Sequence, residues 1–176
     1  MKEHAVRISL GYDTSSTEVG WAVVRSDGEL LEHVASGTIS LNKKASHAAR
    51  MVDLYEDIVK HLGRYSPNLL TVEAMSSIKN AKVVKILQGY IAVVMLAGMQ
   101  ICKLEANVLT PQTVKARVGI NPMSPQEKKK HTSKDIRRIY KAKVIALVNA
   151  RFDLNLGEDE EDRADAIAIA LAGLGG

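Results

Sequence analysis

The spacing of apolar residues divides the chain into segments with the period of strands and segments with the period of helices. Alternating Val6, Ile8 and Leu10 predict a first strand, and the run WAVVR predicts a second. Asp27 and Gly28 then supply the positive φ values that a tight hairpin turn needs, so LLEHVASGTIS is expected to form a third strand. Three antiparallel strands therefore open the predicted fold.

Helices alternate with shorter strands in the rest of the chain. Apolar residues recur at helical spacing from Ser46 to about Leu62, and Gly63 with Pro67 is expected to end that helix. NLLTVEAM has the nearly continuous apolar character of a strand covered on both faces, and it ends in Glu73.

Five more elements and one loop follow NLLTVEAM. The pattern predicts a long helix over about 80–103, a strand in ANVLTP, a short helix closed by Gly119, and the basic helix SKDIRRIYKAKVIALVNARF before a terminal acidic helix. Residues 121–134 hold two prolines and a lysine triplet and are expected to form a loop. The order predicts an α/β fold with a mixed five-stranded sheet and helices on both faces.

Composition limits the number of domains and the compartment. With 176 residues and 46% hydrophobic content, the chain fits one globular domain over residues 1–176. Its single cysteine, Cys102, fits a reducing compartment, and no signal peptide is evident, so a cytoplasmic protein is expected. The uncharged stretch ILQGYIAVVMLAGMQIC approaches membrane-spanning length, but its two Gln and two Gly favour a buried or interfacial helix.

Charge is distributed unevenly along the chain. Between Lys115 and Arg151, eleven Lys and Arg stand against two acids, a net of +9, which leaves −5 for the rest of a chain whose total is +4. A basic block beside an acidic cluster is the pattern expected of a protein that holds a polyanion near metal-binding carboxylates. Basic runs are also common as solvated faces, so this feature alone does not decide the function.

The acids have two possible explanations. Asp13 and Glu73 come at the carboxyl ends of strands, where sites form in open sheets, and Asp162 and Asp165 continue an acidic run into the apolar helix AIAIALA. Helix capping explains the acids of the first turn but explains Asp165 poorly. If the four carboxylates share one space, a divalent cation removes their repulsion, and oxygen-only ligands favour Mg²⁺ or Mn²⁺.

Four segments carry a family resemblance: GYDTSSTEVGWAVV, VEAMSSIKNAKVVKILQGYIAVVMLAG, LTPQTVKARVG and DRADAIAIALA. In this order they resemble successive blocks of the RuvC family of Holliday junction resolvases, which have a ribonuclease H-like fold. The resemblance implies a Mg²⁺-dependent endonuclease, with two ions and Mn²⁺ as a substitute, that acts as a homodimer on four-way DNA junctions. It implies that Asp13, Glu73, Asp162 and Asp165 are the catalytic, metal-binding carboxylates.

The resemblance also suggests DNA contacts and two departures from the family pattern. Lys115 and Lys141 fall where the family has DNA-contacting lysines, and Lys79 follows the central Glu block. Ser76 stands where cellular members carry an aromatic wedge, which opens the question of sequence selectivity. A basic loop insertion around residues 120–138 resembles phage-type members, and its lysines are expected to contact phosphates: Lys128, Lys129 and Lys130.

Three alternative functions remain at the level of the sequence. A nuclease of the same fold for flaps, other branched DNA or RNA–DNA hybrids differs only in substrate. An actin-like phosphotransferase would use the GYDTSST loop, but it needs a second domain and a further phosphate-binding loop. A non-catalytic junction-binding protein would not need all four carboxylates.

Overall fold

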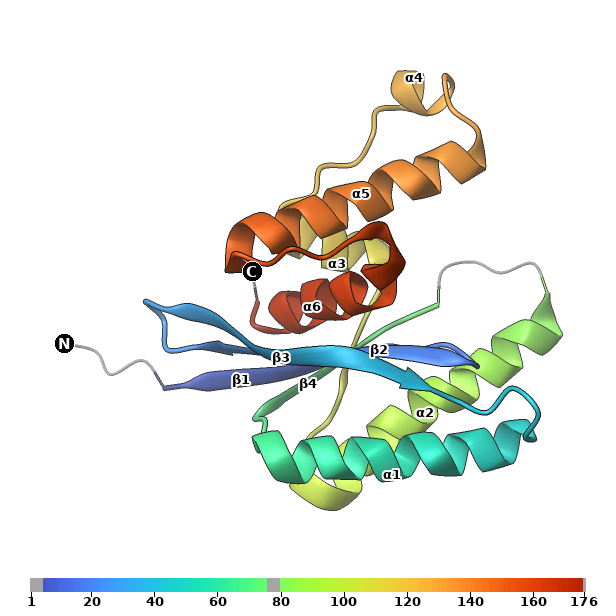
Figure 1. Ribbon diagram of the computed structural model, residues 1–176, viewed down its shortest axis with the longest axis vertical. Coiled ribbons are helices and arrows are strands. Elements are labelled where there is room, and N and C mark those ends of the chain that lie inside the picture. The colour runs from blue at the N-terminus through green and yellow to red at the C-terminus, as the bar shows by residue number, and fades with distance from the viewer. Residues whose placement is uncertain (1–4, 76–79, 176) are drawn as a thin grey trace.

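The structure of the protein, a computed structural model, describes residues 5–75 and 80–175 (Figure 1). A five-stranded sheet has the order β3-β2-β1-β4-β5. Its strands are β1 (Arg7–Asp13), β2 (Glu18–Ser26), β3 (Leu31–Ser40), β4 (Leu69–Glu73) and β5 (Asn107–Leu109). β1 pairs antiparallel with β2, and β2 with β3, whereas β4 runs parallel to both β1 and β5. The predicted mixed sheet, three antiparallel strands followed by two parallel ones, is confirmed.

Helices cover both faces of the sheet (Figure 1). On one face lie α1 (His47–Tyr65) and α2 (Ala81–Cys102), and on the other lie α3 (Pro111–Val118), α5 (Ser133–Phe152) and α6 (Glu161–Gly173). Each face has its own apolar core, one centred on Leu54, Ile58 and Tyr90 and the other on Ile167 and Ile169. The sheet is therefore the middle of three layers, and both of its faces are buried.

The helix α1 continues past the position where the sequence pattern ends it. Gly63 was expected to terminate this helix, but it lies inside α1, which ends at Tyr65. Ser66 adopts the left-handed conformation with φ of 45°, and its N–H bonds to the Leu62 carbonyl, so the C-cap is a serine. Pro67 comes directly after this cap, where it cannot interrupt the helix.

The expected loop over 121–134 contains one short helix. α4 (Pro125–Lys128) begins at a capping box in which Ser124 and Glu127 each bond the other's backbone N–H, and proline occupies its first turn. A second capping box, between Thr132 and Asp135, begins α5. The prediction of a loop over all of 121–134 is wrong here, because the Ser-x-x-Glu capping box begins a helical turn inside it. In Figure 1, α4 lies beyond α5, farther from the sheet than the other helices.

Candidate active site

The first two acids lie at the same edge of the sheet. Asp13 is the last residue of β1 and Glu73 is the last residue of β4. The two strands are parallel neighbours, with Tyr12 in register with Val72. The carboxyl ends of parallel strands meet at one edge, so the placement expected from the sequence is confirmed for both residues.

Close packing of α6 on the sheet brings the other two acids to this edge. A Cβ atom on Gly11 would lie 2.4 Å from the backbone nitrogen of Ala170, and one on Gly20 would lie 2.0 Å from the carbonyl oxygen of Asp162. Only glycine at these strand positions lets the helix backbone approach so closely. As a result, the first turns of α6, which carry Asp162 and Asp165, lie over the ends of the strands.

The pKa of Asp13 responds to the charges of the other three acids. Partial burial raises this pKa well above its ordinary value, and the negative charges of Asp165, Glu73 and Asp162 raise it further. Burial also raises the pKa of Glu73 to about 7, with Asp165 as the next cause. These carboxyls therefore resist ionisation together, as expected of like charges with little water between them.

The helix acids show the same effect. The pKa of Asp165 is raised to about 6, first by burial, with further contributions from Glu161 and Asp162, and the pKa of Asp162 is raised by burial. Capping does not explain this pair, because no side chain caps the start of α6. Glu160 instead accepts from the backbone N–H of Gly157 at 3.3 Å and pairs with Arg163 at 2.8 Å.

Two lysines border the acid cluster, and both were singled out from the sequence. The charge of Lys141 lowers the pKa values of Asp13 and Asp165, and that of Lys115 lowers the pKa of Glu73. Lys141 also pairs with Glu161, and the Lys115 ammonium lies 4.4 Å from the centre of the Tyr140 ring. Each is therefore held close to the carboxylates by a contact of its own.

The donor set fits a hard divalent cation. Among residues 5–75 and 80–175, no three acidic, imidazole or thiol side chains are already grouped as a coordination shell. The charges of Asp165, Glu73 and Asp162 nevertheless all reach Asp13, and each of the four residues is partly buried. A nearby cation stabilises the ionised form of carboxyl groups whose pKa values are raised by burial and by neighbouring negative charge. Oxygen ligands suit Mg²⁺ or Mn²⁺.

The remaining DNA-contact predictions are placed less fully. Lys128, Lys129 and Lys130 are exposed in α4 and the turn after it, and no contact within the described chain ties them to the acid cluster. Ser76 and Lys79 lie outside the described residues.

One group beside the site was missed by the sequence analysis. The guanidinium of Arg50, on α1, donates to the carbonyl of Ser16, in the loop that follows Asp13. Tyr90, on α2, and His47 complete this group. The sequence held no signal for it, because the acceptor is a backbone oxygen and a single arginine on an amphipathic helix is usually exposed.

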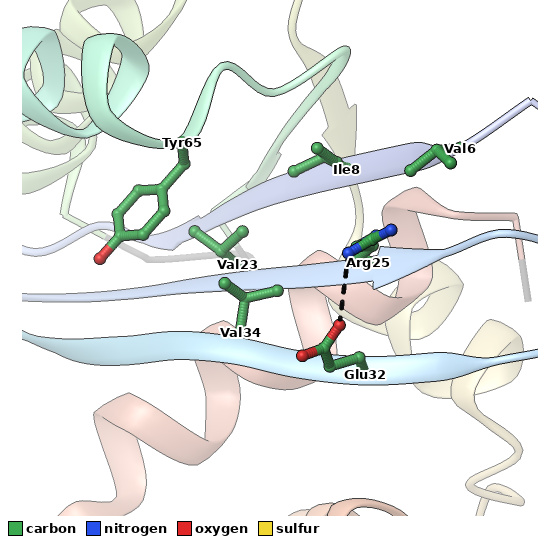
Figure 2. A pocket seen from close by; sticks show the side chains of 7 residues that line it. All are labelled: Val6, Ile8, Val23, Arg25, Glu32, Val34 and Tyr65. Carbon is green, nitrogen blue, oxygen red and sulfur yellow. Dashed lines mark ion pairs between the residues drawn. The ribbon is translucent and has the colours of Figure 1, made fainter.

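A hollow of about 320 Å³ lies elsewhere on the sheet (Figure 2). Val6, Ile8, Val23 and Val34 form an apolar lining, and the ion pair between Arg25 and Glu32 spans 3.8 Å at its side. Val6 directly precedes β1 and Ile8 is the second residue of β1, whereas Asp13 ends this strand. The hollow is therefore at the opposite end of the strands and is separate from the acid cluster.

The chain matches a known protein family. A family model described as Crossover junction endodeoxyribonuclease RuvC matches residues 9–173. Proteins of that name from Halothermothrix orenii and Brucella suis are 27% and 30% identical to this chain. The first match covers 93% of this chain and 90% of the relative, and the second covers 97% and 88%.

Solved structures show the same fold. The RuvC of Thermus thermophilus in complex with a Holliday junction substrate superimposes with a TM-score of 0.74 at 17% identity, over 94% of this chain and 91% of that chain. The yeast mitochondrial Holliday junction resolvase Ydc2 gives a TM-score of 0.55 at 12% identity, over 94% and 76%. The predicted ribonuclease H-like fold is thereby confirmed.

Proposed function

The chain belongs to the RuvC family of crossover junction endodeoxyribonucleases, and on this basis we propose that it resolves four-way DNA junctions by metal-dependent hydrolysis of phosphodiester bonds. One observation carries the proposal: the charges of Asp165, Glu73 and Asp162 all raise the pKa of Asp13, which ends β1, in a chain that matches the family model over residues 9–173. In metal-dependent hydrolysis of phosphodiesters, a cluster of carboxylates would hold the cations beside the scissile phosphate.

Asp13, Glu73, Asp162 and Asp165 are the proposed metal ligands. Mg²⁺ is the proposed cofactor, with two ions per site and Mn²⁺ as a substitute; when bound, the ions supply activation of a water and stabilisation of the leaving 3′ oxygen. Asp13 ends β1, and the charges of the other three acids all raise its pKa, so it is the proposed shared ligand. The products expected are a 5′-phosphate and a 3′-hydroxyl.

The basic residues are proposed to hold the DNA backbone. Lys115 and Lys141 are close enough to the acids to lower their pKa values, so a phosphate bound at the acids would also lie near these ammonium groups. The exposed lysines 128–130 would contact phosphates farther along an arm of the junction. Phosphate contacts set affinity and orientation without reading bases, so junction shape is the expected basis of selection.

We propose that the protein acts as a homodimer through α2. This helix is long and apolar enough to span a membrane, a property shared by core helices of soluble proteins, yet only 22% of the stretch is buried within one chain. Its exposed apolar side chains are Val83, Met95, Leu96, Met99 and Ile101. A second copy would cover this face and give two acid clusters for two strands of one junction. A cytoplasmic location is part of the same proposal.

A broader nuclease of the same fold is the second candidate. Ser76 replaces the aromatic wedge of cellular family members, so it offers no ring for stacking on bases at the crossover. Cleavage of matched four-way junctions, flaps and RNA–DNA hybrids distinguishes the two functions. The main proposal predicts preferential nicking of the junction, whereas equal rates on flaps or hybrids would favour the broader nuclease.

A further inference from the structure

Arg50 is a buried charge with no acidic partner in the part of the chain that the structure describes. It lies in the second turn of α1 and is only 7% exposed. Within residues 5–75 and 80–175, no carboxylate forms an ion pair with its guanidinium, and its Nε has no hydrogen-bond partner. Burying an arginine without an opposing charge is costly, so the contact that it does make is expected to have a role.

The contact of Arg50 is the carbonyl of Ser16. Its Nη1 donates to that oxygen, and the Tyr90 hydroxyl reaches the same oxygen at 3.5 Å. The Nδ1 atom of His47 lies 3.1 Å from the Tyr90 hydroxyl. Because that hydroxyl has one proton, donating it to Ser16 leaves its oxygen to accept from Nδ1–H of His47. Two helices thus bind one backbone carbonyl.

That carbonyl belongs to the loop that joins Asp13 to β2. Within the loop, the Ser15 hydroxyl accepts from the backbone N–H of Glu18 at 2.9 Å. The Thr17 carbonyl accepts from the N–H of Leu41 at 2.8 Å. The remaining anchor, at Ser16, comes from α1 and α2. Asp13 itself pairs with Gly20 in the β1–β2 ladder, so the Ser16 contact holds the middle of the loop that follows it.

We propose that Arg50, assisted by Tyr90, is a positioning residue that fixes the loop of residues 14–17 and thereby the direction of the Asp13 carboxylate. The proposal rests on the proposed function for its effect on cleavage, but not for its effect on the loop. Arg50 acts through a backbone oxygen and touches neither DNA nor the reacting atoms. Misplacement of a catalytic group by about 1 Å costs about 100-fold in rate, so a loosened loop is expected to slow cleavage strongly.

The experiment uses two pairs of matched variants. Arg50→Met removes the guanidinium, and Arg64→Met makes the same change at an exposed position of α1. Tyr90→Phe removes the hydroxyl that reaches Ser16, and Tyr55→Phe removes one that donates to Gln100 at 2.8 Å, also between α1 and α2. Arg50→Lys keeps a donor for the Ser16 carbonyl and tests rescue. All variants are measured below the lowest melting temperature of the set.

The first readout is amide hydrogen exchange of the metal-free protein. Exchange at residues 15–17 should accelerate by about tenfold in Arg50→Met and by a smaller factor in Tyr90→Phe, with neither control changing, since a lost hydrogen bond is worth about 1 kcal/mol. Unchanged exchange in both variants would overturn the proposal that Arg50 and Tyr90 hold the loop of residues 14–17. This readout does not depend on nuclease activity, so it remains valid if the wild-type protein cuts no junction and the proposed function fails.

The second readout is single-turnover cleavage of a four-way junction at saturating enzyme. Arg50→Met should lower the cleavage rate by about 10- to 100-fold while the junction Kd stays within about threefold, and Arg50→Lys should recover part of the rate. Accelerated exchange with wild-type cleavage would overturn the positioning role. A loss confined to junction binding would do the same, because it would make Arg50 a DNA contact.

Discussion

Replacing Glu73 with Gln should stabilise the metal-free protein at high pH while weakening its response to Mg²⁺. The carboxyl of Glu73 ends β4, where burial and the charge of Asp165 oppose its ionisation. Gln has nearly the same shape and no charge. The substitution therefore removes an unfavourable charge from the folded protein and also removes a ligand that a cation would need.

The magnitude follows from the pKa of Glu73, which is raised from its ordinary 4.5 to about 7. A group whose folded pKa is raised contributes stability that is fully present below the unfolded pKa and is lost as the pH rises through the folded pKa. Ionised Glu73 thus lowers the free energy of unfolding by up to ~3 kcal/mol above pH 7, at ~1.36 kcal/mol per pKa unit. Side-chain relaxation and partial solvent access reduce this to about 1–3 kcal/mol.

The assay is urea unfolding in EDTA from pH 5 to pH 8, repeated with excess Mg²⁺. Glu73→Gln should differ least from the wild type at pH 5, exceed it by about 1–3 kcal/mol at pH 8, and gain less from Mg²⁺ than the wild type does. Glu158→Gln makes the same change at an exposed acid and should leave both curves unchanged. A variant that is less stable than the wild type in EDTA at pH 8 would refute the reasoning.

Three further predictions concern packing, assembly and DNA binding. Gly20→Val should lower the free energy of unfolding by about 1–3 kcal/mol and abolish cleavage, because its Cβ would displace the start of α6. Gly63 has open space around it, so Gly63→Ala should instead raise the free energy of unfolding by about 0.5–1 kcal/mol in the same urea titration. Leu96 lies on α2 with 58% of its side chain exposed, and Leu96→Glu should shift sedimentation to a monomer. Leu30 is 61% exposed in the β2–β3 turn, and the control Leu30→Glu should sediment as the wild type does. A wild-type monomer at micromolar concentration would contradict the dimer. Changing lysines 128–130 to Gln should make the slope of log binding constant against log salt concentration shallower by about 5 units, if these lysines contact phosphates in both protomers. Cleavage at saturating enzyme should be nearly unchanged. An unchanged slope would mean that this segment does not contact the DNA backbone.

The sequence predicted those parts of the fold and site that depend on local pattern and strand order. Asp13 and Glu73 were expected at one edge because each ends a strand, and β1 and β4 are parallel neighbours. Asp165 was predicted to have a special role because burying a carboxylate in an apolar helix costs free energy. Its pKa, raised to about 6 first by burial, agrees with that cost. The roles of these acids as metal ligands stay predictions, as does the dimer.

The features that could not be predicted depend on contacts between distant segments. Gly11 and Gly20 determine how closely α6 approaches the sheet, but a glycine inside a strand pattern does not say which backbone it faces. Arg50 on α1 donates to a backbone carbonyl, and because every residue has one, the residue types do not reveal this partner. Gly63 was read as a helix end, although Ser66 in the left-handed conformation ends α1. Glycine is a statistical signal for a C-cap, and another residue can adopt the same geometry when tertiary contacts favour it.

Cleavage of a synthetic four-way junction by the wild type and by Asp165→Asn tests the central claim most directly. Each protein is mixed at saturating concentration with the junction and with a linear duplex of the same sequence, in Mg²⁺ or in EDTA. The account predicts wild-type nicks in the junction only with Mg²⁺ and few in the duplex. It predicts that Asp165→Asn binds the junction within a few-fold of the wild type and cuts it at least ~100-fold more slowly. Cleavage that persists in EDTA, or an Asp165→Asn variant that cuts as fast as the wild type, would contradict the assignment of the four carboxylates.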